Sequence, residues 1–156
     1  MKKIFFYLLV FSAFAFGGCV ADIDKTFNEK TLVEFNATVL SSPAVGKTYP
    51  VISLLNKDST VNAQVNLVGV QRSTETTVTI TVDAAASNGV ENTHYKLPNG
   101  GKVVFPANTS IANFQFQTLK VPAAAGTTIN LVFTLATSGD IEPSFNYKSV
   151  GYAIKL

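Results

Sequence analysis

The chain has 156 residues, of which 47% are hydrophobic and 14% charged, and this balance excludes an intrinsically disordered protein. Its formal net charge is +2, but two of its lysines lie in a leader that we expect to be removed, which leaves ten basic and ten acidic side chains. A neutral chain without a basic cluster excludes a nucleic-acid-binding surface, and a single cysteine excludes a disulfide within the chain.

Residues 1–18 have the three-part organisation of a signal peptide. Two lysines come first, the uncharged run Ile4–Phe16 follows, and two glycines precede Cys19. The run is shorter than the about 20 apolar residues that a membrane-spanning helix needs. Phe16-Gly17-Gly18-Cys19 resembles the bacterial lipobox, which implies cleavage before Cys19 and acylation of its thiol, as palmitate or a similar chain. An ordinary secretory leader with an accidental cysteine is the alternative.

Residues 19–30 predict a lipidated cysteine followed by a flexible tether. The stretch is rich in charge and lacks periodic hydrophobicity, and about 11 such residues reach about 15–20 Å. Asp22 and Asp24 resemble the acidic export signal of surface lipoproteins in Bacteroidetes-type bacteria, although a solvated tether explains them equally well. We therefore expect a lipid anchor in the outer membrane, on either its periplasmic or its surface-exposed face.

Residues 31–156 predict one all-β domain, because their hydrophobicity alternates with a period of two. The clearest alternating segments are 33–39, 62–67, 77–82, 112–117, 129–135 and 150–156. Weaker patterns at 49–55 and 102–105 add two strands, with turn signals between the segments. Seven or eight strands predict an immunoglobulin-like β-sandwich. A short helix within 47–55 is the alternative for that stretch.

Part of the chain resembles the Calx-beta pattern. Glu91-Asn92-Thr93-His94-Tyr95 is followed by a turn, then by Gly101-Lys102-Val103-Val104-Phe105-Pro106-Ala107-Asn108-Thr109-Ser110, and then by alternating Phe114 and Phe116. The resemblance covers residues 61–117 and implies a Calx-beta-like sandwich. Together with the lipobox, it implies a relationship to the Calx-beta-like lipoproteins of unknown function in Bacteroidetes-type bacteria.

The resemblance does not extend to calcium binding. Calx-beta domains of exchangers bind calcium through clustered acids at one end of the sandwich. In this chain His94 stands where the pattern has an aspartate before the tyrosine, and Asn108 replaces its glycine. Asp83 and Glu91 alone do not supply the 6–8 oxygen ligands of a strong calcium site. We therefore predict no metal and no cofactor.

His94, the single histidine, is the one candidate general base. No nucleophile motif of the G-x-S-x-G type accompanies it. We expect it to be a residue at the start of a strand, with Tyr95 packed inward, and we predict no catalytic residue.

Sugar-binding platforms expose aromatic rings, and the chain has no tryptophan. Tyr49, Tyr95 and Tyr147 are the candidates for ligand contact, with packing at a strand edge as the alternative for each. Tyr147 is also well placed for a corner-type hydrogen bond ahead of the last strand. Asp58-Ser59-Thr60 matches a pattern for O-glycosylation in these bacteria, which makes Ser59 a candidate modification site.

These observations favour a non-catalytic cell-envelope lipoprotein whose immunoglobulin-like domain contacts a protein or a glycan at the outer membrane. A glycan-binding accessory of a polysaccharide-uptake system is the main alternative, and an envelope hydrolase dependent on His94 is a third. The expected partners are the membrane, through the lipid on Cys19, and an unknown envelope protein or glycan.

Overall fold

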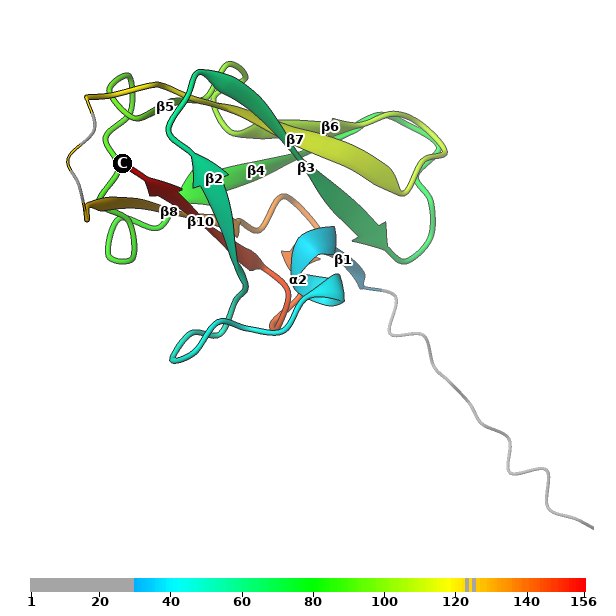
Figure 1. The fold of residues 1–156 in the computed structure, drawn as a ribbon. Helices are drawn as coiled ribbons and strands as arrows, with labels where there is room; N and C mark the ends of the chain where they lie inside the picture. Colours follow the sequence, from blue (N-terminus) through cyan, green and yellow to red (C-terminus); the bar gives the residue numbers. More distant parts are fainter. Residues whose placement is uncertain (1–29, 123, 125) are drawn as a thin grey trace, which may run out of the picture.

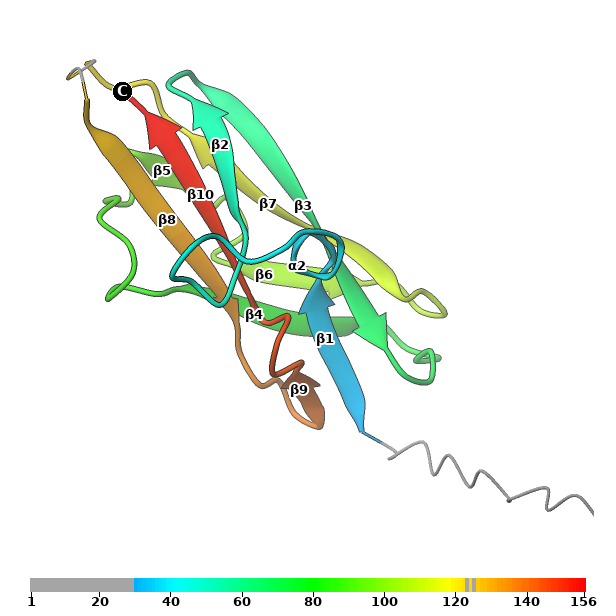
Figure 2. The same ribbon diagram turned by 60° about the horizontal axis from the view of Figure 1, so that its bottom comes forward.

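The computed structural model describes residues 30–122, 124 and 126–156, which contain ten strands and one short helix. The signal peptide, Cys19, Asp22 and Asp24 lie outside these residues. The strands form two five-stranded sheets that face each other (Figures 1 and 2). The first sheet has the order β5-β7-β3-β1-β9, and the second has the order β2-β10-β8-β4-β6. The prediction of an all-β sandwich is confirmed.

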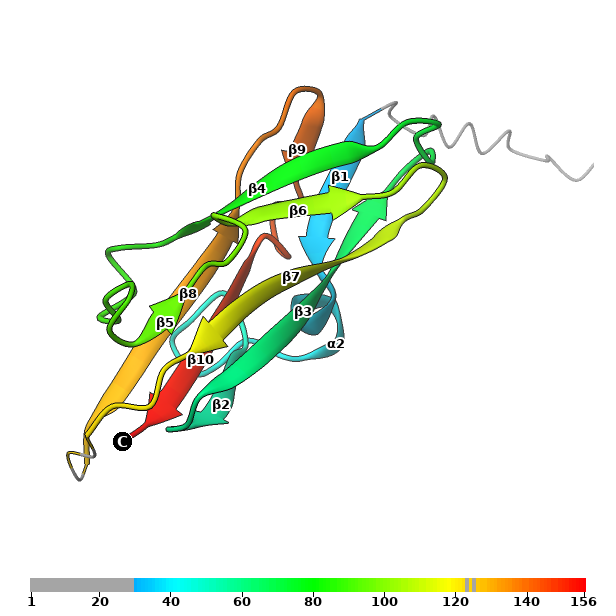
Figure 3. The same cartoon turned by 90° about the horizontal axis from the view of Figure 1, so that it is seen from above.

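Four strands of the two sheets come early in the chain: β1 (Thr31–Phe35), β2 (Val51–Leu55), β3 (Ser59–Val68) and β4 (Thr76–Val82). Three follow in the middle: β5 (Tyr95–Lys96), β6 (Lys102–Phe105) and β7 (Ile111–Thr118). The last three are β8 (Thr128–Leu135), β9 (Ile141–Pro143) and β10 (Ser149–Lys155). Most neighbours are antiparallel, while β1 with β9 and β2 with β10 are parallel. Figure 3 shows β4, β6 and β7 from above the sandwich.

The alternating side chains of these strands build the core, as the period of two predicts. In β7 the side chains of Ala112, Phe114 and Phe116 are buried, while their neighbours along the strand are more exposed. Val103 and Phe105 of β6 alternate in the same way. Burying one such side chain contributes about 1.5–3 kcal/mol, so this alternation is the main reason that the sheets pair face to face.

An aromatic cluster joins the two sheets at the centre of the core. Phe133 of β8 is fully buried, and its ring centroid lies 4.9 Å from that of Phe114 and 4.8 Å from that of Phe116. Phe116 also contacts Tyr152 of β10, at 4.9 Å. Phe114 and Phe116 belong to the first sheet, while Phe133 and Tyr152 belong to the second. Among the described residues, the buried core residues all lie between Val33 and Ile154, so a fragment of residues 20–156 contains all of them.

The prediction of one strand over residues 33–39 is wrong beyond Phe35. Helix α2 (Asn36–Leu40) follows β1 directly and contacts both β3 and β10, which belong to different sheets (Figure 1). Burial is consequently the reverse of the strand prediction, since Thr38 is buried and Val39 is 42% exposed. The Thr38 hydroxyl donates a hydrogen bond to the Ser149 carbonyl at 2.8 Å. The helical turn thereby carries the chain from one sheet towards the other.

Three further details bear on the sequence prediction. The strand predicted from the weaker pattern at 49–55 is confirmed as β2 over Val51–Leu55, so the alternative of a short helix within 47–55 is wrong. Strand β9 was not predicted, and β5 was expected only as a strand starting at His94, because two or three residues are too few to show alternation. Asn108, which replaces the glycine of the Calx-beta pattern, has φ +59°. Asparagine is among the residues that tolerate this left-handed conformation best, so the turn is retained without glycine.

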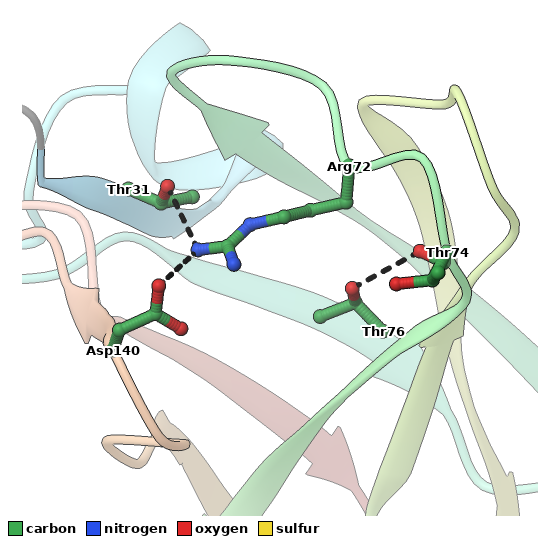
Figure 4. A network of polar contacts seen from close by, with 5 residues as sticks. All are labelled: Thr31, Arg72, Thr74, Thr76 and Asp140. Atoms are coloured by element: carbon green, nitrogen blue, oxygen red, sulfur yellow. Dashed lines mark hydrogen bonds and ion pairs between the residues drawn. The ribbon is translucent and has the colours of Figure 1, made fainter.

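A polar clasp holds the start of β1 (Figure 4). The Arg72 guanidinium, from the segment between β3 and β4, donates to the Asp140 carboxylate at 2.6 Å and to the Thr31 hydroxyl at 3.1 Å. Lys30 forms a second ion pair with Glu142 of β9, at 2.9 Å. These contacts attach the point at which the chain enters the sandwich to β9 and to the β3–β4 segment.

Among residues that the structure describes, no helix has both the length and the apolar character needed to traverse a bilayer.

Candidate functional site

A groove of about 810 Å³ lies between two segments of the sandwich surface. One side is lined by residues 38–43, 47 and 48. They belong to the segment 38–48, which runs from α2 towards β2 and which we call the helix wall. The other side is formed by residues 145–148, between β9 and β10, and we call it the turn wall. Figure 2 shows the cyan segment after α2 passing close to the orange-red segment that leads into β10. The volume is within the about 300–1,000 Å³ typical of small-molecule sites.

The turn wall is held by both sheets. The Phe35 amide of β1 donates to the Tyr147 carbonyl at 2.9 Å, and the Leu135 amide of β8 donates to the Lys148 carbonyl at 2.9 Å. Because β1 and β8 belong to different sheets, the backbone of this turn is fixed relative to the core. The backbone positions from which its side chains extend are therefore defined before any ligand binds.

The helix wall is held in a similar way. The Thr38 hydroxyl attaches α2 to the Ser149 carbonyl of β10. Further along, the Ala44 amide donates to the Tyr49 carbonyl at 3.0 Å, and the Lys47 amide donates to the Ala44 carbonyl at 2.9 Å. These two bonds close the loop that precedes β2. Since both walls are fixed, the groove is preformed, which lowers the entropy cost of binding.

The groove presents apolar side chains that have no partner in the core. Phe145 is 84% exposed and Leu40 is 76% exposed, and they lie on opposite walls. The Lys148 ammonium lies over the Phe145 ring, 5.6 Å from its centroid, within the range of a cation–π contact. Adjacent apolar and aromatic side chains at a rigid hollow are typical of an interaction site.

Hydrogen-bonding groups and positive charge complete the lining. Ser41, Ser42 and Thr48 contribute hydroxyls from the helix wall, and Asn146 contributes an amide from the turn wall. Lys47 adds an ammonium on the helix wall, and Lys148 adds one on the turn wall. Hydroxyl and amide groups both donate and accept hydrogen bonds, so the groove suits a polar ligand that has a flat apolar face.

Two of the three candidate tyrosines lie in this region. Tyr147 is 38% exposed and lines the groove, and the bond that fixes it is made by its backbone carbonyl. Tyr49 lines a neighbouring hollow of about 150 Å³ that shares Lys47 with the groove. Its ring lies against Gly151, where a Cβ would come within 3.0 Å of it. Packing against the sheet therefore fixes Tyr49 beside the groove.

Tyr95 is removed from the ligand-contact candidates, because it is only 5% exposed. Its ring meets Phe133 edge-on at 6.2 Å, inside the core. Burial and the nearby charge of Glu91 raise the pKa of the Tyr95 hydroxyl. This tyrosine packs inward, which was the alternative that the sequence had offered.

His94 closes a loop in the structure. Its Nδ1 accepts a hydrogen bond from the Val90 amide at 2.9 Å, and its own amide donates to the Val90 carbonyl at 2.8 Å. The Leu119 amide donates to the His94 carbonyl at 2.9 Å, which ties the loop to the segment after β7. The imidazole nitrogen that faces the loop is thus engaged in a structural contact.

The acids near the predicted Calx-beta segment have structural roles as well. Asp83 accepts hydrogen bonds from the Ala85 and Ala86 amides at 3.0 and 3.2 Å and so caps the turn after β4. Glu91 is exposed, and its backbone forms an isolated β-bridge with that of Tyr95. Within residues 30–122, 124 and 126–156, no group of three or more histidine, cysteine, aspartate or glutamate side chains is arranged to hold a metal.

The candidate modification site lies at the turn between β2 and β3. Ser59 is half-buried, and the Asp58 carboxylate accepts a hydrogen bond from the Lys120 amide at 2.9 Å. Asp58, Ser59 and Thr60 line a shallow hollow of about 350 Å³. O-glycosylation of Ser59 stays a prediction.

Sequence reasoning missed most of the groove. Phe145, Leu40 and the two lysines were not singled out, because the residues that form the walls are distant in sequence and meet only through α2. One signal was available at Phe145. It lies between Ser144 and Asn146 in a stretch without alternation, where an aromatic ring has no strand face on which to be buried.

No known protein-family profile matches the chain, and no characterised protein matches it in sequence. Among solved structures, it is similar to the apo form of the Calx CBD1 domain, with a TM-score of 0.57 and 12% identity over 81% of this chain and 97% of that one. CBD12 of CALX1.2 and the calcium binding domain CBD12 of CALX1.1 are also similar, with TM-scores of 0.57 and 0.53 and identities of 10% and 11%. The matches cover 79% and 67% of this chain and 43% and 41% of those longer chains.

These similarities concern the fold. Their agreement with the two-sheet topology shows that the chain is a Calx-beta-like β-sandwich, as the pattern over residues 61–117 had implied.

Proposed function

We propose that this protein is a non-catalytic lipoprotein of the cell envelope, anchored in the outer membrane by a lipid on Cys19, and that its sandwich contacts a glycan or a protein through the groove. The observation that carries the contact role is the pairing of a preformed hollow with exposed apolar side chains. Phe145 and Leu40 face solvent on opposite walls, at 84% and 76% exposure. A partner that covered them would gain about 25 cal/mol for each Å² of apolar surface removed from water.

The non-catalytic part of the proposal is supported by what the candidate reactive groups do. The His94 ring accepts a hydrogen bond from the Val90 amide, and the Asp83 carboxylate caps a turn. Both groups are accounted for by the geometry of the loop between β4 and β5. The groove lies between other segments and contains lysine, hydroxyl, amide and aromatic groups.

A glycan is the first candidate for the partner, as in an accessory protein of polysaccharide uptake. The groove combines the Phe145 and Tyr147 rings with the hydroxyls and the amide on its walls. A sugar has the complementary surface, since each ring carries C–H groups on its faces and hydroxyls at its rim. A protein partner is the second candidate.

The location is tested by metabolic labelling with radioactive palmitate. We expect the wild-type protein to be labelled and to fractionate with the outer membrane, and the Cys19→Ala variant to lose both properties. A wild-type protein that takes up no label would overturn the lipoprotein proposal.

The contact role is tested with residues 20–156, fluorescently labelled, on a glycan array and on isolated cell envelopes. We expect retention that falls in Phe145→Ala and Tyr147→Ala. Val70→Ala is the matched control, because Val70 is 77% exposed and lies outside the groove. Retention that is absent on both surfaces, or equal in all variants, would refute a contact through the groove.

A further inference from the structure

We infer that the groove binds an anionic glycan, a polysaccharide chain that carries carboxylate groups. The inference rests on the proposed function and narrows it to one class of ligand. It comes from the distribution of charge around the groove, which the composition of the whole chain does not reveal.

The groove is positive although the mature chain is neutral. Lys47 stands on the helix wall and Lys148 on the turn wall, and none of the groove's lining residues is acidic. The two acids that precede the turn wall in the sequence are already paired, Asp140 with Arg72 and Glu142 with Lys30. Their carboxylates therefore form ion pairs near the start of β1.

Each of the two lysines lies over an aromatic ring. The Lys148 ammonium is 5.6 Å from the centroid of Phe145, and the Lys47 ammonium is 5.9 Å from that of Tyr49. Among the described residues, neither lysine forms an ion pair with an acidic side chain. Ring contacts of this kind contribute only about 0.5–1 kcal/mol at exposed sites. An ammonium group so placed keeps hydrogen-bond donors for an incoming carboxylate. The Phe145 ring, at 84% exposure, also keeps surface that the ammonium does not cover and that a sugar can contact.

The shape of the region suits a chain of sugars. Lys47 lines both the groove of about 810 Å³ and the neighbouring hollow of about 150 Å³ that contains Tyr49. The positive charge and the aromatic rings thus continue from one hollow into the next. Successive residues of an acidic polysaccharide repeat the same pair of features, a carboxylate and a ring.

A glycan fits this lining better than an acidic peptide does. Hot spots of protein interfaces are deep pockets that exclude water around a buried anchor. Here the rings remain open, since Phe145 is 84% and Tyr147 is 38% exposed, and the helix wall of the same groove contributes hydroxyl groups. Such a surface matches a ligand that carries hydroxyls along its whole length.

The test measures binding of polygalacturonate to residues 20–156 by calorimetry and by retardation in affinity gels. Fully methyl-esterified polygalacturonate is the matched ligand, because it keeps the sugar chain and lacks the charge. Poly-glutamate provides the charge without the sugar. We expect binding to polygalacturonate that weakens with added salt, about fivefold weaker binding to the esterified polymer, and weaker binding to poly-glutamate.

Two double variants locate the interaction. Lys47→Gln with Lys148→Gln should weaken binding about fivefold, as expected from two exposed ion pairs. Lys102→Gln with Lys155→Gln removes the same charge from exposed positions outside the groove and should leave binding unchanged. Circular dichroism confirms that each variant is folded.

The outcomes separate this inference from the function on which it rests. Equal binding of the charged and esterified polymers would overturn the anionic preference and leave a glycan-binding groove. Poly-glutamate that binds as tightly as polygalacturonate would overturn the assignment of a glycan as the ligand and favour an acidic peptide. Binding to none of the three polymers overturns this inference, whereas the proposed contact role fails only if the glycan array and the envelopes also retain nothing.

Discussion

The aromatic cluster allows a sharp test of how the fold is stabilised, by the substitution Phe133→Ala. Phe133 is fully buried, and four rings surround it with centroids 4.8–6.2 Å away. Replacing a buried phenylalanine by alanine typically costs about 3–5 kcal/mol. Each aromatic pair adds about 0.5–1.5 kcal/mol beyond the area that it buries. We therefore expect a loss near the upper end, about 4–5 kcal/mol in the free energy of unfolding.

The assay is chemical denaturation of residues 20–156 followed by far-ultraviolet circular dichroism, since the chain has no tryptophan. The matched control is Phe145→Ala, which removes the same side chain at 84% exposure and should change stability by less than about 0.5 kcal/mol. A Phe133→Ala cost below about 1 kcal/mol would refute the role of Phe133 as the bridge between the sheets. A Phe145→Ala cost as large as that of Phe133→Ala would show that Phe145 is a core residue and would remove it from the groove.

Three further predictions concern ionisation and backbone conformation. Burial raises the pKa of Tyr152 to about 12, so the stability that its neutral hydroxyl contributes is complete below about pH 10 and is lost as the pH rises through 12. In urea denaturation at several pH values, Tyr152→Phe should reduce this loss of stability at alkaline pH. The Arg72 hydrogen bond lowers the pKa of Asp140, so the carboxylate stabilises the fold at pH values above its usual pKa and ceases to do so as the pH falls. In the same assay the stability of Asp140→Asn should fall less than that of the wild type below about pH 4. In thermal denaturation, Gly101→Ala should destabilise the fold far more than Gly100→Ala, because a Cβ at Gly101 would collide with a backbone carbonyl of β4, whereas a Cβ at Gly100 would face open space. Gly100→Ala should cost only the about 1–2 kcal/mol of placing alanine in a left-handed backbone conformation, and equal losses would contradict the close approach at Gly101.

The sequence predicted the long strands well because their alternation records the environment of each side chain. In residues 112–117 and 129–135 every second residue faces the core, and β7 and β8 cover these segments. The same reasoning predicted a two-sheet sandwich, because half-buried strands need a second layer. Strands β5 and β9 could not be predicted in this way, since each is shorter than the pattern that would reveal it.

The error after Phe35 has a different cause. Residues 36–40 continue the alternation of β1, yet the chain leaves its sheet there and crosses to β10 by a helical turn. The hydrogen bond from Thr38 to the Ser149 carbonyl joins residues far apart in the sequence. A contact of that kind depends on the tertiary fold, and local propensity does not encode it.

The candidate site was predictable only in part, for a related reason. Tyr49 and Tyr147 were identified as aromatic residues at strand edges, and the structure places them in and beside the groove. The relative positions of these two tyrosines depend on α2 and on the loop after it. The strand predicted over residues 33–39 left no place for that helix. The two lysines of the groove, Lys47 and Lys148, became significant only when the structure showed both walls together.

The most direct test of the account is a map of ligand contacts on the folded domain. Residues 20–156, labelled with nitrogen-15, would be titrated with oligogalacturonate while the amide resonances are followed by NMR. The account predicts shifts concentrated in residues 38–48 and 145–148, with none in the hollow around Ser59. Shifts confined to another part of the surface, or a titration midpoint that stays unchanged when Lys47 and Lys148 are replaced by glutamine, would contradict it.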